Sequence, residues 1–180
     1  LIADTYDYTL NDSKERFMKN ISVSSMRKVA QIWEQRDKSI PLKSIDDLFI
    51  IASIIEKETG KKNEKTLIAS VFYNRLKRNM KLQSDPTVIF SITDGKDFKR
   101  ELSKKDLKTK SLFNTYVTRG LPPLPICYPS LSSLKAAAKP KNTNFLYFVA
   151  DGYGGHFFAK NYKEHKENII KFKNVKKSRK

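Results

Sequence analysis

Residues 50 to 60, with the sequence IIASIIEKETG, constrain this chain more than any other segment, because an apolar run leads directly into two carboxylates and a glycine. Ser44 followed by Asp47 forms a capping-box pattern, and Gly60 is a common C-terminal stop. The sequence therefore predicts a helix over residues 45 to 59. Such a helix can hold an acid in an apolar environment at its C-terminal end.

Glu58 is the carboxylate of this helix that is best placed for chemistry. Ile51, Ile54 and Ile55 form the apolar stripe of the helix. At about 100° per residue, Glu58 falls on that stripe, whereas Glu56 points nearly the opposite way. Loss of hydration and the negative end of the helix dipole both raise the pKa of a carboxyl group, as a general acid requires. The ordinary alternative is a solvated helix end paired with a neighbouring lysine, which would lower the pKa.

Size and cysteine content limit the class of protein. The chain has 180 residues, of which 39% are hydrophobic, and we expect one domain over residues 1 to 180. Cys127 is the only cysteine, which excludes an intramolecular disulfide framework and a cysteine-based zinc site. His156 and His165 have no acidic partner at ligand spacing, so we expect no metal and no cofactor.

The formal net charge of +17 indicates an anionic partner, such as nucleic acid, anionic lipid or an acidic polymer. Much of this charge is lysine spread along helix faces, and residues 171–180 add a dense basic C-terminal tail. Zinc-finger spacing, a ribonucleoprotein aromatic motif and heptads behind a basic region are all missing, so we expect no nucleic-acid partner. The ordinary alternative is that the lysines only keep the helix surfaces solvated and bind no partner.

The remaining sequence predicts an α+β fold that is mainly helical, with one small antiparallel β-hairpin. A helix opens at Asp85, the expected cap, because Pro86 suits the first helical position. The other elements that we expect are helices over 13–36, 63–78, 130–139 and from 161 or 162 onward, and strands over 145–150 and 156–159.

Amides, hydroxyls and aromatic rings gather on the predicted loops, and together they suit a saccharide groove. We predict substrate contacts from Gln83, Ser84, Asp85, Asn114, Thr115, Tyr116 and His156. Each has an ordinary alternative. Gln83 and Asn114 can brace loops, Tyr116 can belong to the core, and His156 can brace a loop. For Asp85 we favour the helix cap.

Linked motifs covering nearly the whole chain resemble those of the endolytic murein transglycosylase family, also called YceG-like or MltG. The motifs are Ala3–Tyr6, Ile54–Thr59, Ser70–Leu76, Leu82–Ile89, Asn114–Tyr116, Gly120–Pro123, and Leu146–Gly152 with Gly155–His156. Residues 124 to 129 depart from the commoner pattern of the family, which bears on the shape of the groove.

The resemblance implies an enzyme that cuts glycan strands of peptidoglycan internally, between N-acetylmuramic acid and N-acetylglucosamine, and leaves 1,6-anhydro ends. Glu58 would be the single catalytic residue, first as acid and then as base, on a lysozyme-like active-site helix. Glu56 and Thr59 would be supporting residues. Residues 1–180 would form one catalytic domain that lacks the upstream membrane anchor and N-terminal region.

The resemblance also implies a location in the bacterial inner membrane. A single-pass upstream helix would anchor the protein, with the domain facing the periplasm beside peptidoglycan synthases such as penicillin-binding proteins. The main alternative is a non-catalytic glycan-binding module in which Glu58 only accepts a hydrogen bond. A basic nucleic-acid or anionic-lipid binder is a third reading.

Overall fold

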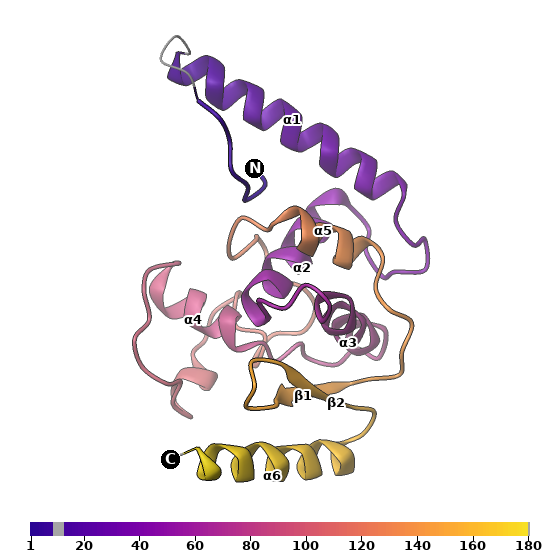
Figure 1. Cartoon of the computed structure of the whole chain (residues 1–180), viewed down its shortest axis with the longest axis vertical. Helices are drawn as coiled ribbons and strands as arrows, with labels where there is room; N and C mark the ends of the chain where they lie inside the picture. Colours follow the sequence, from indigo (N-terminus) through magenta and orange to yellow (C-terminus); the bar gives the residue numbers. More distant parts are fainter. Residues whose placement is uncertain (9–12, 180) are drawn as a thin grey trace.

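The structure is a computed structural model that describes residues 1–8 and 13–179. The predicted α+β class, mainly helical with a small antiparallel hairpin, is confirmed (Figure 1). In chain order the described elements are α1 (Lys14–Glu34), α2 (Ile45–Glu58), α3 (Lys65–Lys77), α4 (Asp85–Thr93), the short 3-10 helix η1 (Asp106–Lys108), α5 (Leu131–Ala138), β1 (Tyr147–Ala150), β2 (His156–Ala159) and α6 (Tyr162–Ser178).

α2 is the central helix of the fold. It packs against α1, α3, α4 and α5 (Figure 1). Leu48, Ile51, Ile54 and Ile55 on this helix are fully buried. Burying an aliphatic side chain contributes roughly 1.5–3 kcal/mol, so this stripe fixes the helix in the middle of the molecule. Ala137 on α5 is also fully buried, and its small side chain allows α5 to approach α2 closely.

The two ends of α2 follow from local capping chemistry. Ser44 is the N-cap, as its hydroxyl accepts a hydrogen bond from the Asp47 amide at 3.1 Å. The Asp47 carboxylate accepts from the amide of Lys43 at 2.8 Å, one residue before the capping-box position. The helix ends at Glu58, one residue earlier than predicted, because Thr59 adopts an extended conformation. Glu58 is therefore the last helical residue.

α3 supplies a second buried surface beside α2. Ile68, Val71 and Phe72 are fully buried on it. The helix begins at Lys65, two residues later than predicted, and Glu64 occupies its N-cap position. Lys65 at its start and Arg75 near its end carry charges but are buried.

The hairpin β1–β2 lies between the helical body and α6 (Figure 1). In the antiparallel register Ala150 pairs with His156. The turn residue Gly152 has φ +84°, and a Cβ added there would lie 2.5 Å from the side chain of Val175 on α6. Glycine is thus required both by the backbone angle and by the close approach of α6. The predicted basic tail belongs mostly to the C-terminal half of this helix, and Lys180 lies outside the described residues.

α1 projects from the body with its N-terminal half, as Figure 1 shows. Only Ser25, Val29 and Ile32 of this helix are buried. Within residues 1–8 and 13–179, no helix combines the length and the apolar character that a bilayer crossing requires.

Candidate active site

A pocket of about 350 Å³ opens at the C-terminal end of α2, with Glu58 in its wall. Five segments of the sequence meet there: α2, α3, residues 82 to 85 at the start of α4, the loop that carries Tyr116, and the hairpin. We call it the glutamate pocket, and it is lined by Glu58, Arg75, Leu82, Gln83, Asp85, Tyr116, Phe148, Val149, Ala150 and His156. Its size falls within the range of small-molecule sites.

Glu58 is half-buried, and its carboxyl group has a raised pKa. Burial raises its pKa to about 7, and the nearby charge of Asp85 acts in the same direction. A hydrogen bond from the Ser84 hydroxyl to Glu58 Oε1, 2.5 Å long, and the positive charge of Arg75 oppose this rise. The group therefore exchanges its proton near neutral pH, which suits a general acid.

Arg75 was not predicted as a site residue, although it lines the pocket. Its guanidinium is buried and donates to the carbonyl oxygens of Leu146 (2.6 Å) and Leu82 (2.8 Å) and to Gln83 Oε1 (3.2 Å). None of the described residues forms an ion pair with Arg75. Its hydrogen bonds go to neutral oxygens, so its positive charge is not neutralised by a carboxylate in direct contact. The sequence could have indicated a buried role for Arg75, because it lies three to four residues after Phe72 and Val71 in the predicted helix over 63–78.

The loop before α4 holds Gln83 and Ser84 in place through Thr115. Gln83 has φ +51°, a left-handed conformation that is uncommon for a residue with a side chain. Its amide donates to the Thr115 carbonyl at 3.1 Å, and the Ser84 amide donates to Thr115 Oγ1 at 3.0 Å. The exposed Gln83 side chain therefore stands at the rim, while buried Ser84 reaches Glu58 rather than open solvent.

Asp85 is not the cap of α4, which corrects the role that the sequence favoured for it. The helix begins at Asp85, so Ser84 is the N-cap residue, and its hydroxyl binds Glu58 instead of a helix amide. The exposed Asp85 carboxylate accepts a hydrogen bond of 2.5 Å from the Tyr116 hydroxyl. Burial and this bond raise the pKa of Tyr116, which keeps the phenol protonated. Asp85 and Tyr116 thus form one wall of the glutamate pocket.

Asn114 and Thr115 lie behind that wall and not on it. Both are fully buried. The Asn114 side-chain amide donates to the carbonyl of Thr109 at 2.8 Å, and its oxygen accepts from the Tyr116 amide at 2.9 Å. Thr115 Oγ1 lies 2.8 Å from Thr87 Oγ1. Neither side chain lines the glutamate pocket, and the hydrogen bonds of both hold the loop that carries Tyr116 in place.

His156 lines the pocket from the start of β2 and is held by Glu64. Its Nδ1 atom lies 2.8 Å from Glu64 Oε2, and its backbone amide donates to Glu64 Oε1 at 3.0 Å. The Thr59 hydroxyl donates to Glu64 Oε2 at 3.3 Å. Glu64, which sequence reasoning missed, therefore joins the end of α2 to the hairpin wall and orients the imidazole.

Comparison with known proteins assigns the family. The model of the YceG-like family matches residues 1–171. The chain belongs to the YceG-like family. The endolytic murein transglycosylase of Bacillus subtilis (strain 168) is 45% identical over 136 residues, which cover 74% of this chain and 37% of that protein. The protein of the same name from Streptococcus pneumoniae serotype 2 (strain D39) is 35% identical over 138 residues, covering 74% of this chain and 25% of its own length.

A solved structure supports the same assignment. The crystal structure of a yceG-like protein from Listeria monocytogenes superposes with a TM-score of 0.69 at 31% identity, covering 89% of this chain and 51% of that one. The family resemblance predicted from the sequence is confirmed. The YceG-like chain spans about a quarter to two fifths of the length of these curated relatives.

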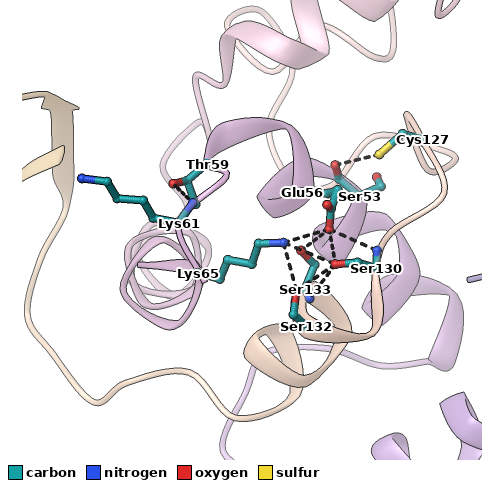
Figure 2. Close-up of polar contacts among 9 residues, drawn as sticks. All are labelled: Ser53, Glu56, Thr59, Lys61, Lys65, Cys127, Ser130, Ser132 and Ser133. Atoms are coloured by element: carbon teal, nitrogen blue, oxygen red, sulfur yellow. Dashed lines mark hydrogen bonds and ion pairs between the residues drawn. The ribbon is translucent and has the colours of Figure 1, made fainter. Parts of the chain in front are cut away.

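Glu56 belongs to a separate polar cluster, which Figure 2 shows together with Lys65, Ser130 and Ser133. Its Oε2 atom accepts hydrogen bonds from Lys65 Nζ (3.0 Å), Ser130 Oγ (2.5 Å), the Ser130 amide (3.1 Å) and Ser133 Oγ (2.5 Å). Burial raises the pKa of this carboxyl group, but the bonds from Ser130, Ser133 and Lys65 outweigh burial and lower it to about 2. Glu56 therefore stays ionised and ties α2 to α3 and α5.

Neither Cys127 nor His165 lines the glutamate pocket. The Cys127 thiol lies 3.3 Å from the Ser53 carbonyl (Figure 2), and burial raises its pKa to about 11. Such a thiol is a poor nucleophile at neutral pH. His165 stacks on Tyr147, with their ring centroids 5.0 Å apart. Among the described parts of the chain, no three His, Cys, Asp or Glu side chains are grouped so as to hold a metal ion.

Proposed function

We propose that this YceG-like domain is a lytic transglycosylase that cuts glycan strands of peptidoglycan between N-acetylmuramic acid and N-acetylglucosamine. The observation that carries the proposal is Glu58, whose pKa is raised to about 7 in a pocket with polar and aromatic walls. Relatives that share up to 45% identity are named endolytic murein transglycosylases, which supports the choice of substrate.

In the first step Glu58 acts as a general acid. Its carboxyl proton passes to the glycosidic oxygen, and the bond between that oxygen and C1 of N-acetylmuramic acid breaks. Positive charge then develops at C1 of the sugar. The Glu58 carboxylate that remains is stabilised by the Ser84 hydroxyl at 2.5 Å and by the positive charge of Arg75.

In the second step the Glu58 carboxylate acts as a base. It takes the proton of the 6-hydroxyl group on the same sugar, whose oxygen then bonds to C1 and closes the 1,6-anhydro ring. No water is consumed, and Glu58 ends the cycle protonated. A glycosidase that uses water generally needs two carboxylates flanking the bond, whereas this intramolecular route needs only one.

The walls of the glutamate pocket would position the sugar. Gln83, Asp85, Tyr116 and His156 present an amide, a carboxylate, a phenol and an imidazole to its hydroxyl and acetamido groups. Phe148 offers an aromatic face for the apolar side of a sugar ring.

The proposal includes a location and partners. A single-pass anchor upstream of the domain would hold it on the periplasmic side of the inner membrane, next to peptidoglycan synthases. The formal charge of +17 suits an anionic surface. Protease added to intact spheroplasts should digest the domain of the full-length protein, and protection from protease would contradict this location.

Mass spectrometry of the products tests the reaction. The domain is incubated with uncrosslinked peptidoglycan strands, with the Glu58→Gln protein as control. Internal fragments ending in 1,6-anhydro-N-acetylmuramic acid support the proposal. Reducing ends instead of anhydro ends would mean hydrolysis, with the Asp85 carboxylate in the same pocket as the candidate base. Binding of strands without cleavage would mean a glycan-binding module.

A further inference from the structure

A second hollow lies along α4, whose first residue, Asp85, lines the glutamate pocket. Its volume is about 460 Å³. We call it the lysine pocket, and it is lined by Lys57, Pro86, Ile89, Phe90, Thr93, Gly95, Lys96, Asp97, Phe98, Ile126, Cys127 and Tyr128. Pro86, Ile89, Phe90 and Thr93 follow helical spacing, so one face of α4 forms its wall.

Neighbouring residues line the two pockets at two points of the chain. Glu58 and Asp85 line the glutamate pocket, while their chain neighbours Lys57 and Pro86 line the lysine pocket. Consecutive Cα atoms are only about 3.8 Å apart. A substituent on a sugar that is bound at Glu58 is therefore close to the entrance of the lysine pocket.

The charges of the lysine pocket are free to bind a ligand. Lys57 and Lys96 are exposed, and the ammonium group of neither lysine forms a hydrogen bond or an ion pair with any residue in the described ranges. Asp97 is the one acidic residue in the lining, so the local charge is positive. Phe90, Phe98 and Ile126 add an apolar floor.

This combination fits an acidic peptide better than more sugar. An unsubstituted glycan offers hydroxyl and acetamido groups, which gain little from two unpaired ammonium groups. A short peptide with carboxylates and methyl groups matches both the lysines and the apolar floor. In peptidoglycan such a peptide is attached to the lactyl group of N-acetylmuramic acid, the same sugar whose C1 reacts at Glu58.

We propose that the lysine pocket binds the acidic peptide stem of the N-acetylmuramic acid residue that is cleaved. The inference rests on the proposed function of the glutamate pocket, and it makes the domain selective for strands that still carry their peptides. Lys57 and Lys96 contact the carboxylates of the stem, and the apolar floor contacts its side chains.

The test compares two substrates that differ only in the peptide. Uncrosslinked strands are used intact or after an amidase has removed their stems. The variant is Lys57→Ala with Lys96→Ala, and the matched control is Lys163→Ala with Lys173→Ala, two exposed lysines on α6. On intact strands the variant should lose about three- to tenfold in kcat/KM, mainly through KM, as expected for two solvent-exposed ion pairs. Its loss should shrink with added salt.

Three outcomes would overturn the proposal: an equal loss of activity on both substrates, no loss on intact strands, or the same loss in the Lys163 and Lys173 control. Binding of the two substrates to the Glu58→Gln protein separates this idea from the proposed function. If wild type cleaves neither substrate, the proposed reaction fails. Tighter binding of intact strands that depends on Lys57 and Lys96 would then still support the peptide site, and equal binding of both strands would refute it.

Discussion

Replacement of Glu58 by glutamine should make the protein more stable at alkaline pH. Burial raises the pKa of Glu58 from 4.5 to about 7, so the folded state holds a proton that the unfolded chain releases. Below pH 4.5 the group is protonated in both states. Between pH 4.5 and about 7 the wild type loses free energy of unfolding as the pH rises, and above about pH 7 this loss is complete.

The size of the effect follows from the same two values. At about 1.4 kcal/mol per pH unit, the interval from 4.5 to about 7 corresponds to about 3 kcal/mol. Water at the pocket mouth solvates a half-buried carboxylate in part, so we expect about 2–3 kcal/mol. Glutamine is neutral at every pH and similar in shape, so it avoids this cost.

Urea unfolding, followed by circular dichroism from pH 4.5 to 8.5, measures the difference between the two proteins. Other titrating groups cancel in that difference. Glu58→Gln should match the wild type near pH 4.5 and exceed it at pH 8. Glu167→Gln, on the exposed surface of α6, controls for the loss of one acidic side chain. Parallel stability curves for wild type and Glu58→Gln would refute the assignment of a buried, protonated Glu58.

Three further substitutions test the surroundings of Glu58. Ser84→Ala removes a hydrogen bond that favours the Glu58 anion, so the pKa of Glu58 should rise further and the alkaline limb of the kcat/KM profile should move to higher pH. Glu56→Gln leaves buried Lys65 without its ion partner and should lower the free energy of unfolding by about 2–4 kcal/mol at pH 7. Because the pKa of Glu56 is lowered to about 2, the wild type should lose this contribution as the pH falls from 4.5 towards 2, whereas urea melts of the variant should lack that slope. Asn114→Ala leaves buried carbonyl groups unpaired and should lower the free energy of unfolding by about 1–3 kcal/mol, measured by thermal or urea unfolding. A change in KM with no change in stability would instead mean that Asn114 contacts the sugar.

The helix that carries Glu58 could be predicted because its signals are local. The Ser44 cap and the isoleucine stripe both act within a few residues, and the placement of Glu58 on that stripe follows from helix periodicity. The hairpin was predictable for the same reason, as its branched and aromatic strands flank a glycine-rich turn.

The partners of Glu58 could not be predicted because they come from distant segments. The N-cap position of α4 is Ser84 and not the predicted Asp85. The Ser84 hydroxyl donates a hydrogen bond to Glu58, which is 26 residues away in the sequence. Glu64 and His156 are 92 residues apart, and no spacing rule relates them. The carbonyl oxygens around Arg75 belong to loops whose paths periodicity does not define.

The most direct test of the central claim is the yield of 1,6-anhydro ends from uncrosslinked strands with wild type, Glu58→Gln and Asp85→Asn proteins, each shown to be folded by circular dichroism. The two variants change the two carboxylates that line the same pocket. We predict anhydro ends from wild type and, at a reduced rate, from Asp85→Asn, with none from Glu58→Gln. Anhydro ends from folded Glu58→Gln at the wild-type rate would contradict the assignment of Glu58 as the acid and base.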